Sequence, residues 1–89
     1  MLRGDPRIEE RAHYIYWRTL RGKPTDRAAC LDAARFFIRQ AEKAPRPWEA
    51  FFALARARWL LHKAGEEMPW GSPEEVQKWF LERFGEGGE

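Results

Sequence analysis

The chain has 89 residues and a net charge of +2, and it is rich in aromatic residues, with five Trp, six Phe and two Tyr. This length suits one small domain, and the single cysteine, Cys30, excludes an internal disulfide and any zinc site built from paired cysteines. No stretch has the roughly 20 consecutive apolar residues of a membrane span, and the opening MLRGDPRIEE lacks the apolar core of a secretory signal. We therefore expect a cytoplasmic protein that does not bind membranes.

The first expected helix covers residues 6–21. Asp5 followed by Pro6 is typical of an N-cap with proline at the first helical position. Gly22 and Pro24 end the segment, because glycine terminates helices and proline cannot continue them. A helical period predicts a core face made of Ile8, Ala12, Ile15 and Tyr16, with Leu20 at its margin.

The second expected helix covers residues 25–43, with Thr25 as its N-cap and Asp26 in its first turn. Its buried arc is wide and comprises Ala29, Cys30, Leu31, Ala33, Ala34, Phe36, Phe37, Ile38 and Ala41. The segment Ala44-Pro45-Arg46-Pro47 then breaks the helix, since proline disfavours helical backbone at the residue before it. Because this link is short, the helices on its two sides should be roughly antiparallel neighbours.

The third expected helix, over residues 47–64, is apolar on nearly all sides. One side carries alanines and leucines, and the other carries the aromatic residues Trp48, Phe52 and Trp59 around Ala55, with Phe51 beside them. A helix with a single apolar stripe lies at a surface, whereas a helix that is apolar all round is buried among neighbours. We therefore expect the third helix to be the central one.

A loop and a fourth helix follow. Met68 and Trp70 are expected to pack onto the bundle from the loop. Ser72, Pro73 and Glu75 have the spacing of a capping box, which begins a helix over residues 73–84 whose inner face is Val76, Trp79, Phe80 and Phe84.

No segment alternates as a strand does, so the sequence predicts a compact all-α bundle of four helices. The bundle should form one domain over residues 1–84, and the Gly- and Glu-rich residues 85–89 should be a disordered tail.

The aromatic side of the third helix is the first candidate binding site. Exposed apolar patches of this size usually mark interfaces. The expected partner-binding residues are Trp48, Phe51, Phe52 and Trp59. The alternative is that the first or fourth helix, or the loop with Trp70, covers this side within the monomer.

A stripe of arginines on the first helix is the second candidate. Steps of four, seven and three residues place Arg7, Arg11, Arg18 and Arg21 on one side, with Tyr14 among them and Trp17 at the edge. Residues 1–47 carry a net charge of +5, and residues 48–89 one of −3. Arginines bind phosphates and aromatic rings stack on bases, so this stripe suits nucleic acid or an acidic protein. The alternative is an ordinary solvated helix face.

Residues suited to catalysis are scarce. His13 and His62 are the only histidines, and His62 with Glu66 provides too few ligands for a metal site. The chain has no Gly-rich phosphate loop, no Ser/His/Asp set and no zinc spacing. We expect a protein that is not an enzyme and has no cofactor.

The sequence therefore favours a small interaction module, an adaptor or accessory subunit that binds another protein or itself through aromatic helix faces. A third option is an inhibitor that masks a site on an enzyme, which the sequence does not separate from an adaptor. The alternative is a nucleic-acid-binding accessory protein that contacts phosphates through the arginine stripe, and its binding would weaken steeply with salt.

Overall fold

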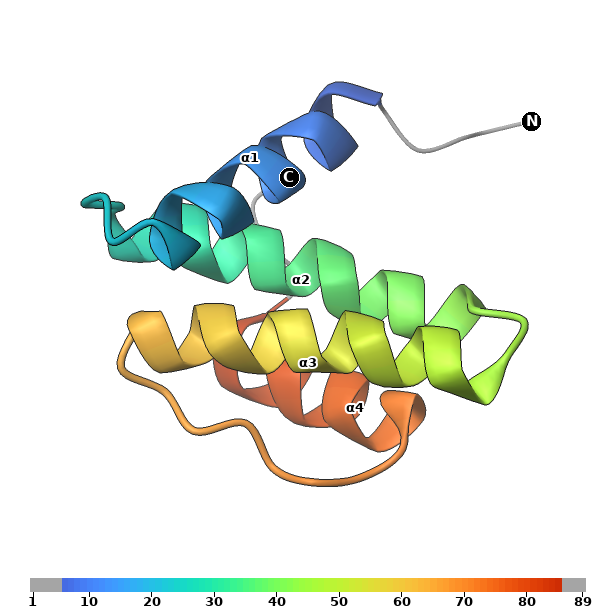
Figure 1. The fold of residues 1–89 in the computed structure, drawn as a ribbon. Helices are drawn as coiled ribbons and strands as arrows, with labels where there is room; N and C mark the ends of the chain where they lie inside the picture. Colours follow the sequence, from blue (N-terminus) through green and yellow to red (C-terminus); the bar gives the residue numbers. More distant parts are fainter. Residues whose placement is uncertain (1–5, 86–89) are drawn as a thin grey trace.

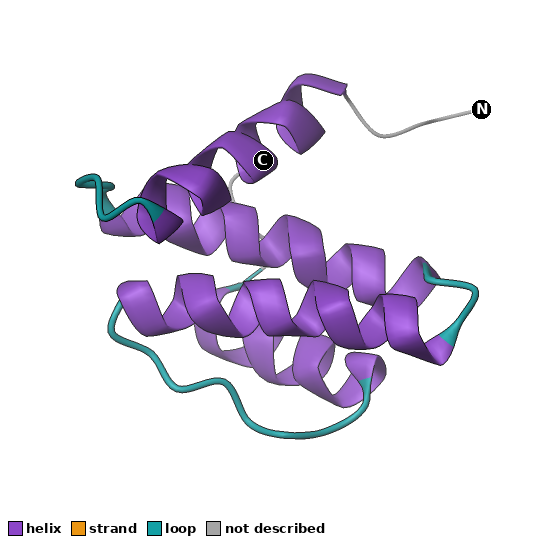
Figure 2. Ribbon diagram, in the orientation of Figure 1, coloured by secondary structure: helices purple, strands orange, loops and turns teal. Residues whose placement is uncertain are grey.

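Four α-helices make up most of residues 6–85, the part of the chain that this computed structural model describes. They are α1 (Pro6–Leu20), α2 (Arg27–Lys43), α3 (Pro47–Lys63) and α4 (Pro73–Phe84) (Figure 1). Within these residues there is no strand (Figure 2). The all-α bundle of four helices is confirmed, and every helix boundary lies within two residues of the predicted one. The predicted cap at Asp5 and the predicted tail beyond Gly85 lie outside the described residues.

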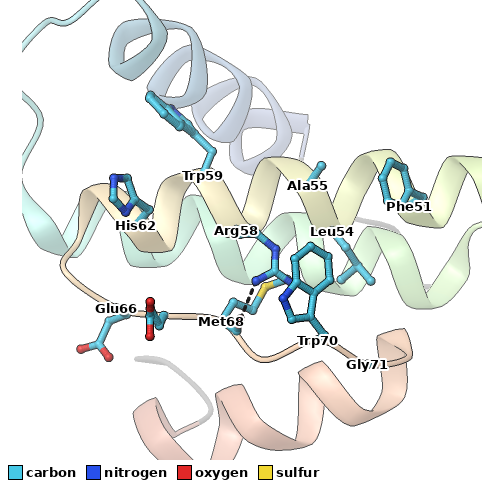
Figure 3. Close-up of a pocket in the computed structure, with 11 residues that line it drawn as sticks. Phe51, Leu54, Ala55, Arg58, Trp59, His62, Glu66, Met68, Trp70 and Gly71 are labelled. Carbon is cyan, nitrogen blue, oxygen red and sulfur yellow. Dashed lines mark hydrogen bonds between the residues drawn. The ribbon is translucent and has the colours of Figure 1, made fainter.

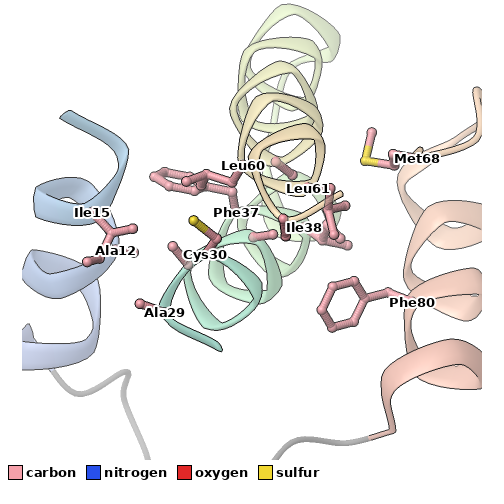
Figure 4. Close-up of a cluster of buried hydrophobic side chains, with 14 of the residues drawn as sticks. Ala12, Ile15, Ala29, Cys30, Phe37, Ile38, Leu60, Leu61, Met68 and Phe80 are labelled. Carbon is pink, nitrogen blue, oxygen red and sulfur yellow. The ribbon is translucent and has the colours of Figure 1, made fainter. Parts of the chain in front are cut away.

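The centre of the bundle is a pair of long antiparallel helices. α3 packs more extensively on α2 than any other two helices pack on each other, as its apolar composition predicts. α2 shares the central position because it also contacts α1 and α4, which flank the pair on opposite sides (Figure 4). The largest fully buried side chains of the core are Phe37, Ile38, Leu60, Leu61, Val76 and Phe80.

The N-cap of α2 is Asp26, one residue after the predicted cap. The Asp26 carboxylate accepts a hydrogen bond from the Ala29 N–H at 2.7 Å, which satisfies one of the free donors of the first turn. The Thr25 hydroxyl instead donates to the Lys23 carbonyl at 3.2 Å. The prediction of Thr25 was wrong because two adjacent residues can both serve as caps, and only the backbone turn selects between them.

The capping box that begins α4 is confirmed. The Ser72 hydroxyl accepts from the Glu75 N–H at 3.2 Å, and the Glu75 carboxylate accepts from the Ser72 N–H at 2.8 Å. Two donors at the start of the helix are thus satisfied reciprocally.

The core face of α1 is shorter than predicted. Ala12 and Ile15 are buried, but Ile8 and Leu20 are exposed. α1 is inclined to α2 and α3, and its amino-terminal end diverges from them (Figure 1). Ile8 therefore lies beyond the end of the packed region, although it is on the predicted side of the helix. Thr19 takes the buried place near the carboxyl end.

The two neighbouring cap candidates of α2 can be told apart by alanine substitution. We expect Asp26→Ala to lower the free energy of unfolding by about 1 kcal/mol, because the Ala29 N–H loses its acceptor. Thr25→Ala should change it by clearly less. Urea denaturation of both variants measures the difference, and a larger loss for Thr25→Ala would contradict the assignment.

Candidate functional site

Three aromatic side chains lie exposed on the outer side of α3. Trp48, Phe51 and Phe52 are 56%, 61% and 56% exposed. The Phe52 ring centroid lies 6.0 Å from that of Trp48 and 6.0 Å from that of Phe51, in edge-to-face arrangements. Aromatic rings attract one another in this geometry, so the three form one continuous apolar cluster. We call these three residues and Trp70 the aromatic patch.

Trp59, the fourth predicted residue on this side, has a different environment. Its ring turns toward α1 (Figure 3), and its indole N–H donates to the Thr19 hydroxyl at 2.8 Å. The same hydroxyl donates to the Tyr16 carbonyl at 2.7 Å. Trp59 is therefore half-buried and joins α1 to α3.

The loop over residues 65–72 behaves only partly as predicted. Met68 is buried in the core, but Trp70 is 80% exposed, so the prediction that it packs onto the bundle was wrong. The Trp70 ring instead lies against the guanidinium of Arg58, whose central carbon is 3.6 Å from the ring centroid. This cation–π contact leaves most of the ring open to solvent.

Arg58 also holds the loop in place. Its guanidinium donates to the backbone carbonyls of Met68 and Pro69, so it connects α3 to the loop at two points (Figure 3). Burial lowers the pKa of Arg58, but an arginine stays charged at neutral pH. The Arg58 guanidinium thereby contacts one face of the Trp70 ring and positions the indole, a role that the sequence did not indicate.

The aromatic patch separates two hollows. The first has a volume of about 570 Å³, lies between α3 and the loop, and is lined by residues that include Phe51, Ala55, Arg58 and Trp70. Arg58 and Leu54 lie beside the Trp70 ring (Figure 3). The second, of about 380 Å³, lies on the other edge of α3 against the carboxyl half of α2. Its lining includes Trp48, Phe52, Glu49, Arg56 and Phe37. Neither hollow follows from local sequence patterns, because each is formed by segments that meet only in the fold.

The arginine stripe of α1 remains on the surface except at one position. Arg7, Arg11 and Arg21 are exposed, as are Tyr14 and Trp17. Arg18 is half-buried and is used within the fold. It donates to the Tyr14 hydroxyl at 3.3 Å and to the Pro24 carbonyl at 2.8 Å, which ties α1 to the loop that follows it.

Glu66 forms an ionic link between distant parts of the chain. Gly65, with φ of +85°, reverses the chain after α3. Glu66 then accepts from Arg83 Nε of α4 at 2.8 Å and from Arg27 Nη2 of α2 at 2.6 Å. The hydrogen bond from Arg83, together with the Arg27 contacts, holds the pKa of the Glu66 carboxyl below its usual range.

His13 and Cys30 pack within the fold, whereas His62 is exposed. The His13 ring packs edge-on against Phe37, with a centroid distance of 5.1 Å. Cys30 is buried, and burial raises the pKa of its thiol. Among residues 6–85, no three side chains of His, Cys, Asp or Glu lie together as a metal-binding set. None of the four described helices is long and apolar enough to cross a bilayer.

Comparisons with protein-family models, with curated proteins and with solved structures match none of them to this chain.

The Trp59–Thr19 contact predicts a specific stability loss. Thr19→Val should lower the free energy of unfolding by about 1–3 kcal/mol, because the half-buried indole N–H of Trp59 loses its acceptor. Thr19→Ser keeps the hydroxyl and should retain most of the stability. Denaturant unfolding of the two variants gives the comparison, and equal losses would show that the hydrogen bond contributes nothing.

The Glu66 ion pairs predict a pH-dependent stability. Because the pKa of Glu66 is lowered in the folded state, the unfolded chain binds the proton more readily. The pairs therefore stabilise the fold above the ordinary glutamate pKa of about 4.3, and this contribution is lost as pH falls through the lowered pKa.

We expect Glu66→Gln to lower the urea midpoint of unfolding at pH 7. In acid, the midpoint of the variant should approach that of the wild type. Glu67→Gln, at the exposed neighbouring position, is the matched control and should show no such convergence. A Glu66→Gln deficit of equal size at all pH values would contradict the ionic explanation.

Proposed function

We propose that this chain is a small non-catalytic interaction module, an adaptor or accessory subunit that binds a partner protein or a second copy of itself through the aromatic patch. The observation that carries this proposal is the exposure of Trp48, Phe51 and Phe52 as one cluster on α3. At about 200 Å² for each aromatic side chain, the exposed fractions of these residues and Trp70 leave about 500 Å² of aromatic surface in water. That is near the upper end for the largest apolar patch of a typical monomer.

The composition of the patch also suits an interface. Aromatic residues are enriched at the buried centres of interfaces, whereas charged residues are depleted there. The charged residues Glu49 and Arg56 lie at its edge beside the second hollow. Trp48, Phe51 and Phe52 are carried by a regular helix that packs on the core, so little conformational entropy is lost when a partner covers them.

Nucleic-acid binding through α1 is the second candidate. Its support is the exposure of Tyr14 and Trp17 among the arginines of the stripe, because exposed rings beside cations can stack on bases. Arg18 weakens this candidate, since its guanidinium already donates to Tyr14 and to the Pro24 carbonyl. In the aromatic patch the Trp70 ring lies against Arg58, but Trp48, Phe51 and Phe52 are more than half exposed.

Serine substitution in the patch tests the proposal. We expect Trp48→Ser combined with Phe51→Ser to weaken binding at least tenfold, since buried aromatic anchors contribute about 2 kcal/mol or more each at interfaces. Trp17→Ser on α1, which removes a similarly exposed indole, is the matched control and should leave protein binding unchanged. Sedimentation over a range of concentrations measures self-association, and titration with each protein recovered from the host extract measures other partners.

The second candidate predicts a different pattern. The chain would then bind a generic nucleic acid at low salt, and Trp17→Ser but not the patch substitutions would weaken this binding. That result would show that the binding surface is on α1. Such binding would also fall steeply with added salt.

A further inference from the structure

We propose that the partner is a second copy of this chain, docked antiparallel along α3 across a two-fold axis. This inference rests on the proposed function and names the partner of the same patch. The patch offers about 500 Å² of aromatic surface per copy, and a stable interface buries about 800 Å² per partner. The patch can therefore be the apolar centre of such an interface, and the polar rim beside it supplies the remaining area.

The spacing along the outer side of α3 is that of a helix-pairing seam. Trp48, Phe52, Ala55 and Trp59 recur at steps of four, three and four residues, as the core positions of paired helices do. The seam joins large residues to one small residue, Ala55, which is itself exposed. In an antiparallel pair, Phe52 of each copy lies opposite Ala55 of the other copy, so bulk meets space. The same register places Trp48 of each copy opposite Trp59 of the other copy. A parallel pair would instead oppose Ala55 with Ala55, which leaves a gap at the centre of the seam.

One edge of this seam carries complementary charges at the same register. Glu49 and Arg56 are seven residues apart and therefore lie on the same edge of α3. A two-fold axis across an antiparallel pair brings like edges together. With Phe52 opposite Ala55, Glu49 of each copy lies within one helical turn of Arg56 of the other copy, and the pair occurs twice.

Both charged groups line the second hollow at the edge of α3. The Arg56 guanidinium is held over the Tyr16 ring, 5.2 Å from the ring centroid. Glu49 has a competing partner in its own chain, but its contact with Arg46 Nη1 is long, at 3.3 Å, and an ion pair of this exposed kind contributes little. A second copy can therefore recruit Glu49 at small cost.

The opposite edge of α3 carries a further pair of residues that meet between the two copies in the same register. Phe51 and Arg58 are also seven residues apart on one edge, and both line the 570 Å³ hollow beside Trp70. The antiparallel arrangement places Phe51 of each copy beside Arg58 of the other copy, at the mouth of that hollow. The Phe51 ring then covers Trp70, which accounts for the 80% exposure of this indole in the single chain.

The inclination of α1 leaves room for the second copy. α1 diverges from α3 toward the amino-terminal half of α3 (Figure 1), where Trp48 and Phe52 are open to solvent. It closes on α3 only near Trp59, which bonds to Thr19. The open part of α3 thus holds Trp48, Phe52 and Ala55, and in the proposed register Trp48 of the second copy lies opposite Trp59, at the edge of the contact between α1 and α3.

Charge reversal gives a decisive experiment. Glu49→Arg alone and Arg56→Glu alone each create two like-charge contacts in a pair of identical copies. We expect each variant to raise the dissociation constant of the dimer at least tenfold. An equimolar mixture of the two variants restores both opposite-charge contacts, so it should form a heterodimer of twice the 10.6 kDa chain mass with nearly wild-type affinity. Sedimentation of the wild type, each variant and the mixture measures this.

A second variant tests the apolar seam without touching the fold. Ala55 is exposed in the single chain, so Ala55→Arg should abolish the dimer while leaving the melting temperature unchanged at concentrations where the wild type is monomeric. Circular dichroism melting of every variant separates loss of pairing from loss of folding, and recovery in the mixture shows independently that both charge variants fold.

The outcomes separate this inference from the proposed function. A wild-type chain that stays monomeric up to about 1 mM, or a dimer that charge reversal and Ala55→Arg leave intact, overturns the antiparallel pairing. If that monomer still loses another protein partner on Trp48→Ser with Phe51→Ser, the proposed function stands. A dimer whose dissociation constant is unchanged by these serine substitutions overturns both the antiparallel pairing and the proposed function.

Discussion

The contact between α2 and α3 is the constraint on which the rest of this small fold depends. Small side chains on the facing sides, among them Ala34, Ala53 and Ala57, let the two helices approach closely while Leu60 and Leu61 fill the space around them. α1 and α4 have few buried residues of their own and gain their core only by packing on this pair (Figure 4). The buried residues of the described part of the chain form one core cluster, as expected for a domain of this size.

As a consequence, α3 has two apolar sides, and other helices cover only part of the second, aromatic side. The alanine and leucine side packs on α2, and α1 reaches the aromatic side only at Trp59. Trp48, Phe51 and Phe52 are left in water. Exposed apolar patches of this size commonly mark interaction sites, which is the basis of the proposed function.

A few long-range polar contacts decide where the surface features lie. The Trp59–Thr19 hydrogen bond sets the end of α1 against α3. Arg58 anchors the loop and contacts Trp70, and Glu66 joins the start of that loop to α2 and α4. Each of these contacts joins residues that are at least ten positions apart, and each places an element next to the aromatic patch or its hollows.

The sequence by itself determined the helices, the capping box at Ser72 and the buried arc of α2, because these depend on backbone preferences and periodicity within a few residues. The aromatic side of α3 was also visible in the sequence, but its exposure was not. Exposure depends on the angle at which α1 crosses α3, which left Ile8 and Phe52 uncovered, and on Arg58, which holds Trp70 at the surface. Only the tertiary structure decided these points, because they arise where segments distant in the chain compete for the same apolar surface.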